Sequence, residues 1–220
     1  MATSMAGSGT VASIFTSRGV YGTINVDDET DDVLNVTDPT FTSPTYTVGE
    51  WVSFTINTDD NGVSTISGVS ALATTGPIPP ITGNYTADIV ALPGQVYTIT
   101  GAGTIASGNL TINGGKVIVE KNAQVTPPTG STIAVNGGIM VARGGGKITG
   151  NAIGINAGGS MKAVNGGSVT GNSIGVNNGG RMIAGNKNGA GTIATTPGTL
   201  TIQGIRALRV ANDGTSAING

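Results

Sequence analysis

One stretch of this chain is repeated almost unchanged. Residues 147–167 and 168–188 align without a gap, and 11 of the 21 aligned positions hold the same residue. The repeated residues are Thr149/Thr170, Gly150/Gly171, Asn151/Asn172, Ile153/Ile174, Gly154/Gly175, Asn156/Asn177, Gly158/Gly179, Gly159/Gly180, Met161/Met182, Ala163/Ala184 and Asn165/Asn186. A fixed period near 21 residues indicates a stack of structural repeats.

The same spacing continues upstream. The sequences INGG, VNGG, INAGG and VNNGG, which begin at 112, 135, 155 and 176, place a leading Ile or Val 23, 20 and 21 residues apart. Between them lie short alternating runs that favour strands, and Gly and Asn tolerate the positive φ of tight corners. At about 3.3 Å per residue, three short strands and three turns use about twenty residues. We therefore expect a right-handed parallel β-helix over 95–220; an α-helical solenoid is disfavoured because each glycine costs about 1 kcal/mol in a helix.

The two most similar rungs also carry a family resemblance. The sequences GNAIGIN at 150–156 and GNSIGVN at 171–177 resemble rungs of the pectate-lyase-like β-helix superfamily, which includes phage tailspikes and fibres. The resemblance implies the fold of residues 95–220 and no particular activity.

The first half of the chain has a different composition. Residues 1–80 hold one basic and nine acidic residues, a balance of −8, whereas 81–220 hold nine basic and three acidic residues, a balance of +6. The two halves meet near the sequence TTGPIPPITG, whose prolines fix φ and lack an N–H donor. The pattern predicts an all-β chain with an N-terminal arm (1–8), a barrel (9–73), a linker (74–94) and the β-helix (95–220).

Residues 9–70 resemble a cold-shock domain, a small OB-type barrel. The matching residues are Gly9, Val11, Gly19, Tyr21, Gly22, Ile24, Asp32, Val33, Gly49, Val52, Phe54 and the hairpin Asp59–Gly62. In that family nucleic acid stacks on aromatic side chains of the second and third strands, but here those places hold Thr23, Leu34 and Val36. Because stacking contributes roughly 1–3 kcal/mol per base and phosphates need basic partners, we expect an attachment domain that binds no nucleic acid.

Residues typical of catalytic and metal sites are scarce. The chain has no cysteine and no histidine, which excludes disulfides, thiolate metal sites and a histidine base. The G-x-S-x-G match around Ser173 has Ala152 at the same place one repeat earlier. Residues 81–220 offer only Asp88, Glu120 and Asp213 as carboxylates. We expect no enzyme activity and no cofactor.

The acidic stretch 27–32 is a second candidate for a metal site. Clustered carboxylates can bind Ca²⁺, but the stretch lacks the spacing of an EF-hand loop. A solvated turn between strands is therefore the better interpretation.

Four residues are candidates for an interface. Trp51 is expected to lie on the opposite strand face from Phe54 and to be exposed, while Tyr21 is the one aromatic residue kept on the barrel's second strand. Lys162 and Arg181 belong to a set of single basic residues spread over the rungs. Such residues fit a weak anionic partner, either a surface glycan or the acidic half of another copy.

These observations lead to one main hypothesis and two alternatives. The main hypothesis is a structural virion component, a bacteriophage fibre or capsid decoration protein, that forms a homotrimer and contacts capsid or tail proteins. The start of the chain has no basic residue before Arg18 and does not resemble a secretory signal, and no apolar run reaches the roughly 18 residues of a membrane span. The alternatives are a bacterial surface adhesin or matrix protein that binds glycans, and a degenerate polysaccharide-degrading enzyme.

Overall fold

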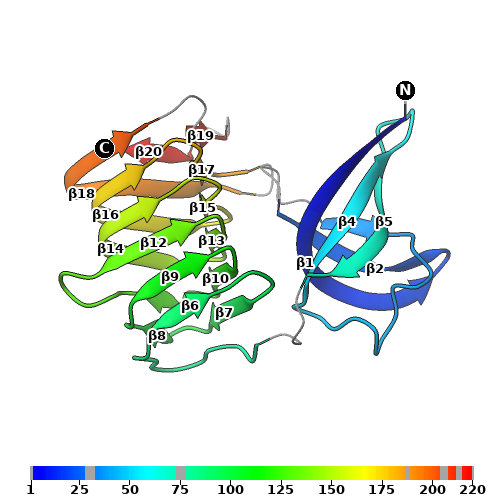
Figure 1. Ribbon diagram of the computed structural model, residues 1–220, viewed down its shortest axis with the longest axis horizontal. Helices are drawn as coiled ribbons and strands as arrows, with labels where there is room; N and C mark the ends of the chain where they lie inside the picture. Colours follow the sequence, from blue (N-terminus) through cyan, green and yellow to red (C-terminus); the bar gives the residue numbers. More distant parts are fainter. Residues whose placement is uncertain are drawn as a thin grey trace. The chain divides into compact units, whose positions relative to one another are not determined.

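The computed structural model describes residues 2–27, 33–72, 78–186, 189–203, 208–211 and 215–219. These residues form strands and connecting segments and contain no helix, and so no helix that could cross a membrane. The chain divides into two compact units: Met1–Pro77 with Gly94–Val96, and Ile78–Pro93 with Tyr97–Gly220 (Figure 1).

The first unit is a closed five-stranded barrel. Its strands are β1 (Thr3–Ser17), β2 (Val20–Val26), β3 (Val33–Val36), β4 (Trp51–Thr58) and β5 (Ser64–Ala71). They pair in the order β1-β2-β3-β5-β4, and β1 pairs with β4 to close the barrel. Only the β3–β5 contact is parallel. Closure leaves the barrel without a free sheet edge.

Strand β1 is long because it serves two neighbours. Residues 3–10 pair with β4, and the part from Gly9 onward pairs with β2. At the overlap, a Cβ on Gly9 would lie 2.3 Å from the Asn25 carbonyl oxygen, so only glycine fits this close approach. The expected arm at 1–8 is different in the structure: residues 3–8 are the first part of β1, since their backbone groups bond to residues 53–58 of β4.

The segment between β3 and β4 closes the barrel core from outside the sheet. Phe41 and Tyr46 are buried with ring centroids 5.0 Å apart, and the Tyr46 hydroxyl donates to the Val69 carbonyl oxygen at 2.6 Å. Burial, together with the nearby Asp38 and Glu50 carboxylates, raises the pKa of Tyr46. The buried core residues are Val11, Ile24, Val26, Val36, Phe41, Tyr46, Val52, Phe54, Ile56, Ile66 and Val69.

Asp38 ties this segment to β5. Its carboxylate accepts hydrogen bonds from the Thr40 hydroxyl at 2.7 Å, the Thr40 amide at 2.9 Å, and the amides of Gly68 and Val69 at 3.0 and 3.3 Å. The bond from the Thr40 hydroxyl, supported by the three amides, lowers the pKa of Asp38 from its usual 3.8. The charged form of Asp38 therefore holds the segment in place.

The second unit is a β-solenoid of about 6 turns with rungs of ~21 residues, as the repeat predicts. Its strands are β6 (Ile89–Ala91), β7 (Val96–Thr100), β8 (Ile105–Ala106), β9 (Leu110–Asn113), β10 (Lys116–Glu120), β11 (Gln124–Val125), β12 (Thr132–Asn136), β13 (Ile139–Ala142), β14 (Lys147–Ile155), β15 (Ser160–Ala163), β16 (Gly167–Val176), β17 (Arg181–Ala184), β18 (Gly191–Ile202), β19 (Leu208–Val210) and β20 (Ala217–Asn219). All pairings between these strands that are described are parallel, and Figure 1 shows the strands stacked rung upon rung.

The strands of the solenoid lie on three faces. One face is the six-stranded sheet β7-β10-β13-β15-β17-β19. The long strands β14, β16 and β18 each contribute to the other two faces: their first parts follow β8 and β11, and their second parts follow β6, β9 and β12. We call the face made by β6, β9, β12 and the second parts of β14, β16 and β18 the β9 face.

Identical register stacks the interior residues into columns. On the β9 face, Ala91, Ile112, Val135, Ile155 and Val176 are paired rung to rung, and each is fully buried. Next to this column, asparagine side chains form a ladder. The amide of Asn136 donates to Asn113 at 2.9 Å, Asn156 donates to Asn136, and Asn177 donates to Asn156. Each rung therefore both fills the core and satisfies the polar groups of the rung beside it.

Glycines at one corner of each rung are required by packing. A Cβ on Gly146, Gly167 or Gly191 would lie 2.1, 2.0 or 1.7 Å from a carbonyl oxygen of the previous rung. Gly154 and Gly175 differ, because a Cβ there would meet nothing within 4 Å. The same residue type is thus essential at one position of the rung and unconstrained by the fold at another.

The solenoid begins earlier than the sequence analysis expected. Ile81 bridges to Ile99, Tyr85 bridges to Ala106, and β6 pairs with β9. Residues 81–91 therefore form a first rung within the expected linker 74–94. Residues 74–77 of the expected linker lie outside the described part, as does residue 73, the last residue of the expected barrel.

Candidate interaction surfaces

The carboxylates of the solenoid form contacts between rungs. Glu120 makes an ion pair with Arg143 of the next rung, with the guanidinium Nη2 at 2.7 Å and Nε at 2.8 Å from one carboxylate oxygen. Asp88 accepts bonds from the amide N–H and the side-chain amide of Asn109, at 2.8 and 3.0 Å. Asp213, the third carboxylate, lies outside the described residues. Within the described ranges, no group of three or more acidic side chains could hold a metal ion.

Ser173 also has a local role in the stack. It lies on β16 directly over Ala152 of β14, and its hydroxyl donates to the Asn151 carbonyl oxygen at 3.5 Å. The Ser173 hydroxyl therefore bonds to the previous rung, as the asparagine side chains of the ladder do.

Trp51 differs from its predicted exposure. It is the first residue of β4 and lies outside the barrel core cluster that contains Phe54, which agrees with the expected alternation. However, its side chain is only 8 % exposed, so the predicted exposure is wrong. Alternation assigns a side chain to a face of a strand but does not determine whether that face is covered. The indole Nε1 has no hydrogen-bond partner among the described residues.

The other three candidate interface residues differ in their exposure. Tyr21, on β2, is partly buried and packs against the barrel core. Arg181 is an exposed first residue of β17. Lys162, on β15, is 2 % exposed although it alternates with the core residues Met161 and Ala163. The four residues are spread over two units, and Lys162 is not an exposed contact.

The acidic stretch cannot be placed as a site. Asp27 ends the residues described after β2, and residues 28–32 lie outside the described part. The possibility of Ca²⁺ binding at 27–32 therefore stays a sequence-based hypothesis.

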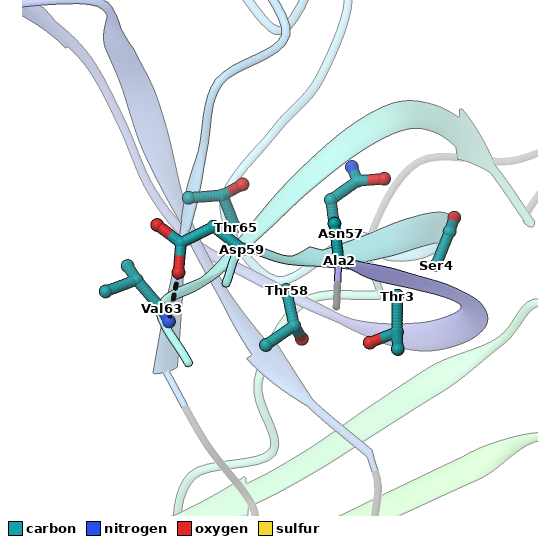
Figure 2. Close-up of a pocket in the computed structure, with 8 residues that line it drawn as sticks. All are labelled: Ala2, Thr3, Ser4, Asn57, Thr58, Asp59, Val63 and Thr65. Carbon is teal, nitrogen blue, oxygen red and sulfur yellow. Dashed lines mark hydrogen bonds between the residues drawn. The ribbon is translucent and has the colours of Figure 1, made fainter. Parts of the chain in front are cut away.

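A pocket that the sequence analysis missed lies on the barrel, where β1 begins and the β4–β5 hairpin turns (Figure 2). It has a volume of about 400 Å³ and is lined by Ala2, Thr3, Ser4, Asn57, Thr58, Asp59, Val63 and Thr65. One oxygen of the Asp59 carboxylate accepts hydrogen bonds from the amides of Asn61 and Val63 at 2.9 and 2.8 Å. The sequence predicts the hairpin turn. It does not predict the other wall of the pocket, because residues 1–8 were expected to form an arm and not the beginning of strand β1.

The pocket combines polar side chains with a lining surface that is mainly apolar. Its lining supplies four hydroxyl groups, one amide and one carboxylate that already holds the turn. The Asn57 amide donates to Ser67 at 2.8 Å, and Thr58 shares a hydrogen bond with Ser64 at 2.9 Å. Asn57, Thr58 and Asp59 are therefore already engaged within the barrel, and the lining offers a ligand apolar surface as well as hydroxyl groups.

The β9 face is smooth and uncharged. Its outward column is Val90, Thr111, Ala134, Gly154, Gly175 and Thr201. Small side chains therefore cover this side of the solenoid from the first rung to the end of β18.

Comparison with protein-family models, with curated proteins and with solved structures gives no match.

Proposed function

We propose that the protein is a non-enzymatic structural component of a bacteriophage virion, a fibre or a capsid decoration protein. In this proposal the acidic barrel is the attachment domain and the solenoid is a rigid shaft. The barrel is of the OB type, a five-stranded closed sheet, and the solenoid is right-handed, the hand that nearly all parallel crossovers adopt.

The observation that carries the proposal is the use of polar side chains within the stack. Asp88 bonds to Asn109, Glu120 to Arg143, and the asparagine ladder spans four rungs. In an enzyme such groups converge on a substrate, whereas here they join each rung to its neighbour. Rigidity along the solenoid is what a shaft requires.

The experiment that tests the proposal is co-purification with particles. Cultures of the encoding organism are treated to induce prophages, and particles are separated on a density gradient and analysed by quantitative mass spectrometry. We expect the chain in the particle fraction at a constant ratio to the major capsid or tail protein. Recovery in the cell-envelope fraction, with none in the particles, would contradict the proposal.

The glycan-binding alternative is favoured by the pocket at the β4–β5 hairpin. Its lining brings hydroxyl groups and apolar surface together, and saccharide sites use both kinds of contact. The test is a glycan array probed with the wild-type chain, with Asn57→Ala, and with the control Thr111→Ala on the solenoid. A glycan bound by the wild type and the control but lost in Asn57→Ala would favour the adhesin.

Self-association belongs to the main proposal. A symmetric assembly would cover apolar surface and free strand edges. The native mass of the chain tests the homotrimer expected from the sequence.

A further inference from the structure

Three strands contribute a row of polar side chains to the pocket at the β4–β5 hairpin. Ser4 of β1 pairs with Asn57 of β4, and Asn57 pairs with Thr65 of β5. Residues paired across neighbouring strands direct their side chains to the same face of a sheet. All three residues line the pocket (Figure 2). The row therefore presents polar groups to one cavity from positions that the strand pairing fixes.

Polar atoms of this row are available to a ligand. Among the described residues, the hydroxyl groups of Ser4 and Thr65 have no hydrogen-bond partner. The Asn57 amide nitrogen donates to Ser67 at 2.8 Å, which leaves the side-chain oxygen of Asn57 as an acceptor. The row thus offers two hydroxyl groups, which both donate and accept, on either side of one amide oxygen.

Asp59 adds a carboxylate that the hairpin turn holds in place. Its Oδ1 atom accepts hydrogen bonds from the amides of Asn61 and Val63, at 2.9 and 2.8 Å. Its Oδ2 atom has no hydrogen-bond partner in the part of the chain that the structure describes. A hydroxyl group that donates to a carboxylate forms a stronger hydrogen bond than one that donates to a neutral oxygen. The turn therefore orients a strong acceptor at the pocket and leaves that acceptor unused.

Charge and apolar surface narrow the class of ligand. Asp59 is the charged residue among the described lining residues, and residues 1–80 hold nine acidic residues and one basic residue, so an anionic ligand is repelled. Ala2 and Val63 supply apolar surface, and the Val63 side chain is 58 % exposed. The volume of about 400 Å³ lies within the roughly 300–1,000 Å³ of small-molecule sites. A ligand with several hydroxyl groups and C–H surface matches this lining.

We propose that the pocket binds a neutral saccharide. Hydroxyl groups of the sugar donate to Asp59 Oδ2 and to the side-chain oxygen of Asn57, and they accept from the hydroxyl groups of Ser4 and Thr65. The C–H surface of the sugar contacts Val63. This inference rests on the glycan-binding alternative and deepens it by naming the ligand class and the groups that bind it. It does not depend on virion membership.

The test is titration of the 220-residue chain with monosaccharides, followed by saturation-transfer difference NMR. The neutral probes are glucose, galactose, mannose and rhamnose, and the charged probes are glucuronate and glucosamine. Asp59→Asn keeps an oxygen for the two turn amides but replaces the free acceptor with a donor. Asp60→Asn makes the same charge change one residue away, outside the described lining, and is its matched control. Thr65→Val removes one hydroxyl group, with Thr111→Val on the solenoid as its control. Circular dichroism checks that each variant keeps its strands.

We expect at least one neutral probe to bind the wild type and both controls with the same affinity. Asp59→Asn should weaken this binding about tenfold or more and Thr65→Val about fivefold, because a hydrogen bond to a charged group contributes more than a neutral one. The inference is overturned if only charged probes bind or none does, if either pocket variant leaves the affinity unchanged, or if Asp60→Asn weakens binding as much as Asp59→Asn.

Failure of the inference is distinct from failure of the proposed function. A glycan that the wild type binds on the array, with an affinity that Asp59→Asn leaves unchanged, would overturn the pocket as the site while the glycan-binding alternative stands. Virion membership is decided separately by co-purification with particles.

Discussion

Two glycines of the solenoid should respond oppositely to the same substitution. Gly167 and Gly154 both lie within strands, β16 and β14, and neither has a positive φ. Neither position therefore requires glycine because of its backbone conformation. The two glycines differ in their surroundings. A Cβ on Gly167 would lie 2.0 Å from the Ala142 carbonyl oxygen, whereas a Cβ on Gly154 would meet nothing within 4 Å.

The size of the effect follows from this contact. An ordinary contact begins at 3.4 Å, so Gly167→Ala must separate the two rungs locally by about 1.4 Å, a large part of the roughly 4.8 Å between strands. Such a shift breaks neighbouring rung-to-rung bonds, including Val164 N–H to Ala142 O at 2.9 Å and Ser168 N–H to Gly146 O at 3.0 Å. With each bond contributing about 1 kcal/mol net and more when its partners stay buried, we expect a loss of about 2–4 kcal/mol.

Gly154→Ala should instead raise the free energy of unfolding by about 0.5–1 kcal/mol, because alanine loses less conformational entropy on folding than glycine. Urea denaturation followed by circular dichroism measures both variants, and Gly175→Ala one rung later serves as a repeat of the Gly154 change. If Gly167→Ala and Gly154→Ala differ by less than about 1 kcal/mol, the steric reasoning for the corner glycines is refuted.

Three further predictions concern polar contacts. Asn136→Ala removes two ladder bonds and should lower the free energy of unfolding by about 1–2 kcal/mol, against a smaller loss for Asn113→Ala at the ladder's end, both measured by urea denaturation. Asp38→Ala should cost about 1–2 kcal/mol near neutral pH, after allowance for solvent screening. Because the folded-state pKa of Asp38 lies below 3.8, its contribution is present above that pH and is lost as the pH falls further, so wild type and variant should converge in acid; a constant difference would contradict the assignment. Glu120→Gln should cost less than about 1 kcal/mol, and this cost should shrink in high salt, because the pair with Arg143 is partly exposed.

The repeat length predicted the solenoid, and the recurrence of the same residue types at equal positions predicted the columns of stacked side chains. Once strands recur every ~21 residues, residues at equal positions must stack, which brings Asn156 over Asn136 and Ser173 over Ala152. The pocket was not predictable by this route. It needs residues 2–4 beside the β4–β5 hairpin, and small polar residues at a chain start carry no periodic signal of a strand.

Sequence by itself determined the rung length, the strand-forming pattern and the absence of cysteine and histidine chemistry, because these depend only on local spacing and residue type. Tertiary structure alone decided which polar groups meet and which surfaces stay open. Glu120 finds Arg143 one rung away, and Trp51 is covered. Each of these outcomes depends on a residue's neighbours in space, and those neighbours are distant from it in the sequence.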